Sequence, residues 1–294
     1  MTALVDAPLR AVSAALTERA LFGGVGVLAP GGEVRVLGGR LRVAEVAVSG
    51  LRLVPVGSVP VGVVPFDEAW YRTISRGVVP SGLVPSGLVP SGAVPSGAVP
   101  SGVVPSGLVP GGLSVRLCPV PGGVLVTCSA GFRWAMVTRR RVLGVLESLV
   151  DRVCGRAVAL ADASVVVGAA ILRGRTVLAQ QRAYPVDAAG RWELPGGRVE
   201  PAESDVDAVV RECAEELGVA VRAGEVVGPD VALSGRKVLR IYRAELVDVR
   251  AEPHPHDHQA LRWLIAGRLG QVDWLPADRV LLPALRQLLR APPR

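Results

Sequence analysis

The chain has 294 residues, a length that suggests two domains, and its formal net charge is +7. Half of the residues are hydrophobic, which is enough for sizeable cores. Four cysteines without C-x-x-C spacing argue against a zinc site, and they are too sparse for a secreted disulfide scaffold. The lack of a signal-peptide pattern and of an apolar run of roughly 18–20 residues favours a cytoplasmic protein without a membrane partner.

The positive charge is spread along the chain, and residues 139–141 form the only tight run of arginines. Such short runs usually belong to a solvated surface, so we do not expect stable binding of nucleic acid. An anionic small molecule would still be attracted by the overall positive field.

Residues 1–78 contain short stretches in which apolar and polar residues alternate, as in Glu33–Leu37 and Leu41–Val46. This alternation is typical of half-buried strands. We therefore treat 1–78 as a strand-rich segment, and it contains no recognisable catalytic group.

A pentapeptide repeat of the form VPSGX fills residues 79–113. Each proline removes a backbone donor and each glycine favours turns, which excludes a regular helix or a central strand. The pattern resembles elastin-like repeats and predicts a flexible or turn-rich linker without a core of its own.

The segment 114–160 resumes the regular pattern. Ser114–Leu117 and Val124–Cys128 flank a Pro-Gly-Gly turn and predict a hairpin, and the apolar spacing over 140–154 predicts an amphipathic helix. Together with the strands before the repeat, these elements would make an α+β segment that the repeat interrupts.

From Ser164 onward the sequence predicts a buried strand at 165–172, a turn, and a second strand at 176–182. Residues 204–217 then favour a helix. Ser204 suits the N-cap, two aspartates occupy the first turn, and Gly218 suits the C-terminal end.

Three carboxylates share one face of this predicted helix, because Glu212, Glu215 and Glu216 are spaced i, i+3, i+4. Their mutual repulsion disfavours a purely structural role, and their oxygens suit a hard cation such as magnesium or manganese. Arg211 and Glu203 lie near enough in sequence to support the cluster.

Residues 197–219 resemble the Nudix box, G-x5-E-x7-R-E-U-x-E-E-x-G-U, in which U is aliphatic. Every fixed position is filled, and Cys213 at the first U position acts as a small hydrophobe. The resemblance covers about 164–290, and the WELPGG stretch at 192–197 is similar to the MutT branch of the family. Further similar segments are 239–243, 257–263 and 274–278.

This resemblance implies a magnesium site, with manganese as the alternative ion, formed by Gly197, Glu212, Glu215 and Glu216. Glu203 and Arg211 would support the metal ligands. A carboxylate of the helix or Asp257 would activate the attacking water, and the resemblance leaves open which one. The implied catalytic residues are therefore Glu203, Arg211, Glu212, Glu215, Glu216 and Asp257.

The resemblance also implies contacts to a nucleotide substrate. Arg182 and Arg240 would contact phosphate or base, and Trp192 would flank the base. Asp278 stands where MutT-like enzymes read the base edge, and the Gly196–Gly197 pair lets the backbone approach a phosphate.

The expected fold is of the α/β class, an α/β/α sandwich with a mixed central sheet over 164–290. The expected reaction converts a nucleoside triphosphate, such as oxidised dGTP, CTP or dCTP, to the monophosphate and pyrophosphate, which would sanitise the nucleotide pool and so serve DNA repair. Two alternatives remain: hydrolysis of ADP-ribose or a dinucleoside polyphosphate, and a ligand-sensing domain without catalysis. The intact glutamate cluster argues against the second alternative.

Overall fold

The computed structural model describes residues 1–36, 39–56, 112–130 and 139–291. The chain divides into two compact units, Met1–Val25 with Gly31–Ala161, and Gly26–Pro30 with Asp162–Arg294. Of the repeat predicted at 79–113, residues 79–111 lie outside the described residues.

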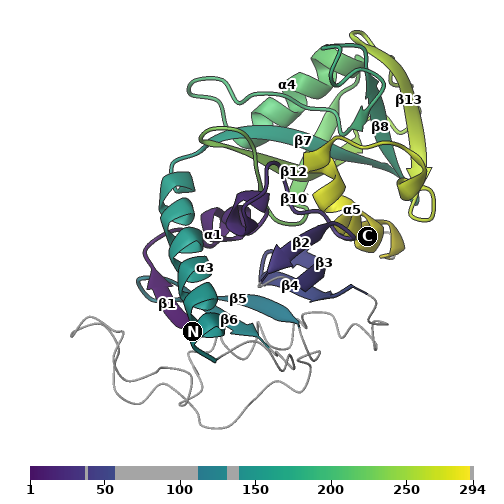
Figure 1. The fold of residues 1–294 in the computed structure, drawn as a ribbon. Coiled ribbons are helices and arrows are strands. Elements are labelled where there is room, and N and C mark those ends of the chain that lie inside the picture. Colours follow the sequence, from purple (N-terminus) through teal and green to yellow (C-terminus); the bar gives the residue numbers. More distant parts are fainter. Residues whose placement is uncertain (37–38, 57–111, 131–138, 292–294) are drawn as a thin grey trace. The chain divides into compact units, whose positions relative to one another are not determined.

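The first unit contains a six-stranded antiparallel sheet with the order β1-β6-β5-β4-β3-β2 (Figure 1). Its strands are β1 (Thr2–Val5), β2 (Glu33–Val36), β3 (Gly39–Ala47), β4 (Gly50–Pro55), β5 (Leu113–Val120) and β6 (Gly123–Ala130). β4 pairs with β5, so segments on the two sides of the repeat share one sheet. The predicted hairpin is β5–β6.

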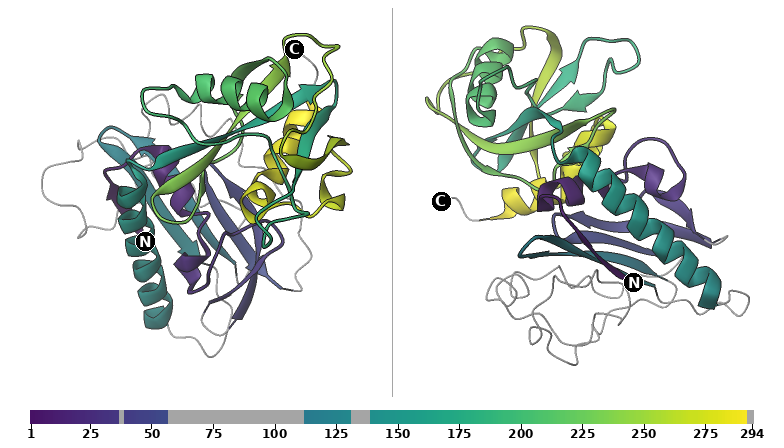
Figure 2. Two further views of the ribbon diagram at one scale, coloured as in Figure 1. Left: turned by 90° about the horizontal axis from the view of Figure 1, so that it is seen from above. Right: turned by 90° about the vertical axis from the view of Figure 1, so that its left-hand side faces the viewer.

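The helices of this unit are α1 (Leu9–Ala15), η1 (Arg19–Phe22) and α3 (Arg139–Leu160). α1 and α3 pack against each other, and α3 also packs on β1 and β6 (Figure 2). Alternate strand residues such as Val126 and Cys128 are buried, as are Leu149 and Val153 of α3. α3 contains the helix predicted at 140–154 and extends beyond it.

The second unit contains a seven-stranded sheet with the order β10-β12-β7-β8-β13, with β11 on β12 and β9 on β8. Its strands are β7 (Ser164–Arg173), β8 (Thr176–Arg182), β9 (Trp192–Glu193), β10 (Val221–Val226), β11 (Val231–Ala232), β12 (Lys237–Leu246) and β13 (His258–Ile265). β12 and β7 run parallel, whereas the other strand pairs are antiparallel. The predicted mixed sheet is therefore confirmed.

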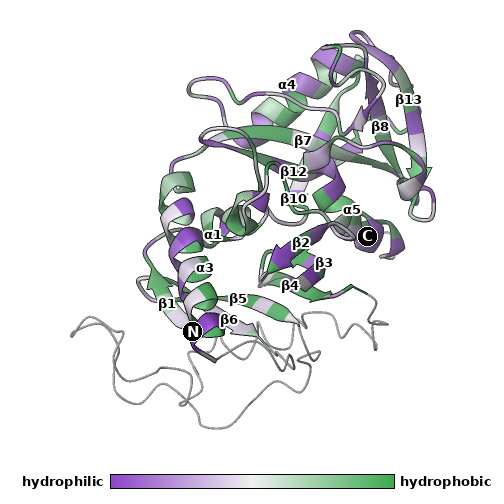
Figure 3. Ribbon diagram, viewed as in Figure 1, coloured by the Kyte–Doolittle hydropathy of each residue, from purple (hydrophilic) through white to green (hydrophobic). Residues whose placement is uncertain are grey.

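Helix α4 (Asp205–Leu217) covers one side of this sheet. Its apolar residues, including Val209 and Cys213, form one buried cluster with Val167, Ile171 and Leu178 of the strands. Figure 3 shows β7 as apolar along its length, whereas polar and apolar residues mix along β13. Parallel pairing and cover by a helix account for the apolar character of β7.

A second helix, α5 (Pro276–Arg290), follows the short turn η2 (Leu269–Gln271). In Figures 1 and 2, α5 lies on the side of the sheet away from α4. Pro276 stands at its first turn, where a missing N–H costs nothing. Within the described ranges, no helix has the length and apolar character that a membrane crossing requires.

Candidate active site

The helix that carries the three glutamates begins and ends where the sequence predicts. The Ser204 hydroxyl oxygen accepts a hydrogen bond from the Asp207 amide at 3.2 Å, and the Ser204 backbone is extended, as an N-cap requires. Gly218 closes the helix in the left-handed conformation with a φ of 67°. Both ends of α4 are therefore set by capping residues, which fixes where its carboxylates lie along the helix.

The histidine-rich loop before β13 completes the C-terminal end of α4. The backbone N–H groups of His254 and His256 donate to the carbonyl oxygens of Leu217 and Glu216, each at 3.0 Å. These bonds satisfy two of the carbonyls that the last turn of a helix leaves free. The loop also holds Asp257, whose side chain is exposed, beside the helix end.

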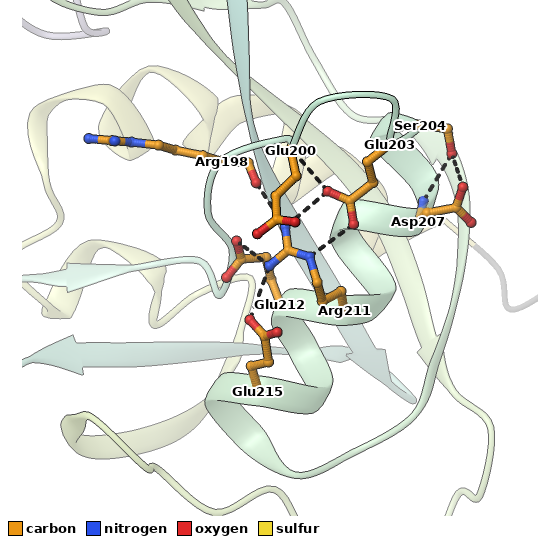
Figure 4. Close-up of polar contacts among 8 residues, drawn as sticks. All are labelled: Arg198, Glu200, Glu203, Ser204, Asp207, Arg211, Glu212 and Glu215. Carbon is orange, nitrogen blue, oxygen red and sulfur yellow. Dashed lines mark hydrogen bonds and ion pairs between the residues drawn. The ribbon is translucent and has the colours of Figure 1, made fainter.

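Arg211 gathers three carboxylates around one guanidinium group (Figure 4). Its Nε and Nη2 bind both oxygens of Glu203 at 2.9 and 3.0 Å. Its Nη1 binds Glu212 Oε1 and Glu215 Oε2, both at 3.0 Å. Nη2 also donates to the Arg198 carbonyl at 2.9 Å, so the planar donors of Arg211 are fully engaged.

The electrostatics of this group follow from the contacts. Hydrogen bonding to Arg211 lowers the pKa of Glu203, and the Glu200 amide, at 2.9 Å from Glu203 Oε2, adds to the effect. The same carboxylates raise the pKa of Arg211, mainly through Glu203. Three carboxylates share one cation, so the group keeps a negative charge.

Glu216 lies apart from this guanidinium in a more buried place. Its Oε2 accepts hydrogen bonds from the Gly196 amide at 3.0 Å and from the side-chain Nε2 of Gln180 at 2.9 Å. Burial raises the pKa of Glu216, and these two donors act in the opposite direction. The carboxylate is thus oriented by the strand side of the site as well as by α4.

Gly196 and Gly197 must lack side chains because other atoms of the protein approach them closely. A Cβ on Gly196 would lie 2.1 Å from the Val167 carbonyl oxygen, and its φ of 152° is one that other residues rarely adopt. A Cβ on Gly197 would lie 2.2 Å from Glu212 Oε1. The missing side chain at Gly197 is therefore what allows the Glu212 carboxylate to lie against the backbone.

The predicted metal ligands present a donor set that fits a hard divalent cation. Glu212, Glu215 and Glu216 offer only oxygen atoms, and their surroundings are net negative. Among the described residues, no three acidic, histidine or cysteine side chains already converge as a metal cage. In this structure Arg211 bonds two of the carboxylates instead, and the Gly197 carbonyl accepts from the Val167 amide at 2.8 Å.

A second polar group lies on neighbouring strands of the same sheet. Glu193 of β9 accepts two hydrogen bonds from Arg182 of β8, at 2.9 and 2.7 Å, and lies 3.0 Å from Nε2 of His258 in β13. Arg182 is among the site residues predicted from the sequence, whereas Glu193, Gln180 and His258 are not. The alternation of β8 places Gln180 on the same face as Arg182, and this pattern was the available signal for Gln180.

Trp192, the first residue of the WELPGG stretch, and Asp278 of α5 are both buried. The Leu275 amide donates to the Trp192 carbonyl at 2.7 Å, and Arg262 lies 5.0 Å from the centroid of the Trp192 ring. Asp278 Oδ1 accepts from the Leu194 amide at 3.0 Å. Two distant segments of the chain therefore meet here.

Arg240 lies outside both groups. It binds Asp230 through two hydrogen bonds at 3.1 and 2.6 Å, and Asp205, at the start of α4, at 2.7 Å. Asp230 is only 2% exposed, so this ion pair is largely buried. The contacts tie β12 to α4, and the substrate contact predicted for Arg240 stays a prediction.

We expect Arg240→Gln to destabilise the protein by about 3 kcal/mol, because it removes the guanidinium charge that two hydrogen bonds hold against the buried Asp230 carboxylate. Urea unfolding measures this change. Arg243→Gln is the matched control, since Arg243 lies on the same strand and pairs with the exposed Glu245. A fall in kcat/KM with unchanged stability would contradict the structural role of Arg240.

We expect Asp278→Asn to alter how stability depends on pH. Burial raises the pKa of Asp278 to about 7, so the folded state binds this proton more tightly than the unfolded state does. The wild type should therefore lose roughly 1 kcal/mol per pH unit, relative to the variant, between about pH 4 and pH 7.

Thermal or urea unfolding across this range measures the difference. Asp273→Asn, at an exposed carboxylate, should follow the wild type. Parallel curves for wild type and Asp278→Asn would contradict the buried, protonated state of Asp278.

Comparison with known proteins gives the same assignment. The model of the NUDIX domain family matches residues 163–285. The "Putative 8-oxo-dGTP diphosphatase 2" of Mycobacterium tuberculosis is 48% identical over 128 residues, which cover 42% of this chain and 89% of that protein. The CTP pyrophosphohydrolase of Escherichia coli is 38% identical over 128 residues, covering 44% of this chain and 95% of that protein.

A solved structure, the E. coli ORF135 protein in solution, shares 38% identity and covers 44% of this chain and 93% of that one, with a TM-score of 0.39. The box residues, the geometry around Arg211 and the identity to the M. tuberculosis diphosphatase and the E. coli CTP pyrophosphohydrolase agree. The chain belongs to the Nudix hydrolases, in their MutT-like branch.

Proposed function

We propose that the chain hydrolyses a nucleoside triphosphate to the monophosphate and pyrophosphate, with magnesium or manganese as cofactor, and so sanitises the nucleotide pool. The observation that carries this proposal is the carboxylate group around Arg211, set beside Glu216 and the Gly196–Gly197 turn. An anionic site of this kind attracts a divalent cation, and a cation is what a polyphosphate substrate needs.

Gly197, Glu212, Glu215 and Glu216 would hold the ion. When bound, it supplies positive charge against the phosphate oxygens of the substrate. Arg211 and Glu203 keep the carboxylates in place, because the two-point bond between them anchors the guanidinium.

Water attacks a phosphorus atom, and a carboxylate takes its proton. The candidates are the glutamates of α4 and Asp257, which the histidine loop brings to the end of that helix. The Gly196–Gly197 backbone, free of side chains, lets the Glu212 carboxylate lie against it beside the proposed ion site.

The substrate class that we propose is oxidised dGTP or a cytidine triphosphate. The relatives named above support it, because one is named for 8-oxo-dGTP and the other for CTP. Asp278, with a pKa of about 7, is able to present either a donor or an acceptor to a base edge. Trp192 and Arg182 would complete the base and phosphate contacts.

We expect Glu212→Gln and Glu216→Gln to lower kcat by several orders of magnitude while the fold is kept, because each change removes a charged oxygen donor from the ion site. The measurement combines pyrophosphate release in the presence of magnesium with circular dichroism. Glu225→Gln, an exposed residue of β10, is the matched control. Unfolding of the first two variants would mean that the cluster serves stability instead.

The substrate itself is tested by pyrophosphate release from CTP, dCTP, 5-methyl-dCTP, oxidised dGTP and dGTP, with phosphorus NMR of ADP-ribose and diadenosine tetraphosphate reactions. Rapid turnover of a cytidine or oxidised-guanine triphosphate is the expected result. Activity confined to ADP-ribose or the dinucleotide would overturn the substrate class and keep the Nudix chemistry. Inactivity on all of them would favour the ligand-sensing alternative.

A further inference from the structure

Gln180 is a fully buried polar side chain in an otherwise apolar part of the sheet. It is 0% exposed and follows Val177, Leu178 and Ala179, which are buried as well. Strand alternation places Gln180 on the same face as Leu178, which packs in the core beneath α4. An apolar residue would be the ordinary choice at such a position.

Of the two polar atoms of the Gln180 amide, the nitrogen makes a hydrogen bond and the oxygen does not. Its Nε2 donates to Glu216 Oε2 at 2.9 Å, whereas its Oε1 is buried and has no hydrogen-bond partner among the described residues. Turning the amide round would place its oxygen against the carboxylate, so the chemistry of the pair sets the orientation. A buried carbonyl without a partner lowers stability, and such a group in a native fold calls for an explanation.

The two donors to Glu216 act on the same oxygen atom. The Gly196 amide and Gln180 both bind Oε2, from the loop and from β8. A carboxylate held through one oxygen by two donors cannot rotate freely about its last bond. The other oxygen, Oε1, is thereby left to serve the site.

We propose that Gln180 is a positioning residue that holds Glu216 with Oε1 directed to the cation site, at the expense of local stability. The proposal deepens the function proposed above and rests on it for the role of Glu216. Outer-shell partners of metal-binding carboxylates commonly change metal affinity or activity by about 10–100-fold when they are removed.

Gln181 provides a matched control on the adjacent residue. It lies on the opposite face of β8, and its Nε2 donates to the Gly190 carbonyl at 2.8 Å rather than to a carboxylate. Replacing each glutamine by methionine keeps the length of the side chain and removes the amide. Only the variant at Gln180 alters the surroundings of Glu216.

The experiment compares the full-length wild type, Gln180→Met and Gln181→Met by three measurements: Mn²⁺ binding without substrate, by electron paramagnetic resonance; steady-state kinetics on the best triphosphate; and thermal unfolding. For Gln180→Met we expect Mn²⁺ affinity and kcat to fall by roughly tenfold or more, with KM little changed. Its Tm should stay close to that of the wild type, because the loss of an unpaired buried carbonyl offsets the loss of one donor to Glu216. Gln181→Met should match the wild type in Mn²⁺ affinity and kcat.

Wild-type Mn²⁺ affinity in Gln180→Met would overturn the proposal, as would a loss of Tm large enough to account for the loss of activity. An equal effect of Gln181→Met would also overturn it. The binding measurement needs no substrate. Failure of the proposed function, seen as a wild type inactive on every triphosphate, is therefore distinguishable from failure of the positioning role.

Discussion

Negative charge concentrated on one turn of a helix is the constraint around which this site is built. Glu212, Glu215 and Glu216 are neighbours on α4, and like charges at such spacing repel one another. Arg211 relieves part of this repulsion by binding Glu212 and Glu215, while Glu203 holds the other edge of the guanidinium. The charge that remains is what a divalent cation would neutralise.

The sheet supplies the backbone contacts that position two carboxylates of α4. β7 carries the Pro195–Gly197 segment alongside it through the bonds from the Ala169 and Val167 amides, at 2.7 and 2.8 Å. This pairing directs the Gly196 amide toward Glu216, and it brings the Gly197 backbone against Glu212. A change in the register of this segment would therefore disturb both carboxylates together.

On one face of β8, three alternate residues lead from the apolar core to the polar groups of the site. Leu178 packs in the apolar cluster under α4, Gln180 contacts Glu216, and Arg182 binds Glu193. The buried polar groups have costs, since Gln180 Oε1 and His258 Nδ1 lack partners among the described residues. Polar groups retained in this way at the edge of a core are expected where stability has been exchanged for function.

The sequence by itself determined the parts of the protein that depend on local spacing. The bounds of α4, its capping by Ser204 and Gly218, and the shared face of its glutamates all follow from residues within one helix. The strands β7 and β8 follow from short apolar runs in the same way. The short helix α1 was not predicted, because its burial in the first unit comes from packing on α3 rather than from a strong periodic pattern.

The tertiary structure decided which distant side chains meet. Gln180 and Glu216 are 36 residues apart, and His258 and Glu193 are 65 apart, so only the pairing of β8, β9 and β13 and the packing of α4 bring them together. Arg240 is a further example, because its ion pairs with Asp205 and Asp230 join β12 to residues distant in the sequence. Chemistry within a helical turn can be predicted from the sequence, whereas contacts across strands depend on pairing and register, which the sequence does not display locally.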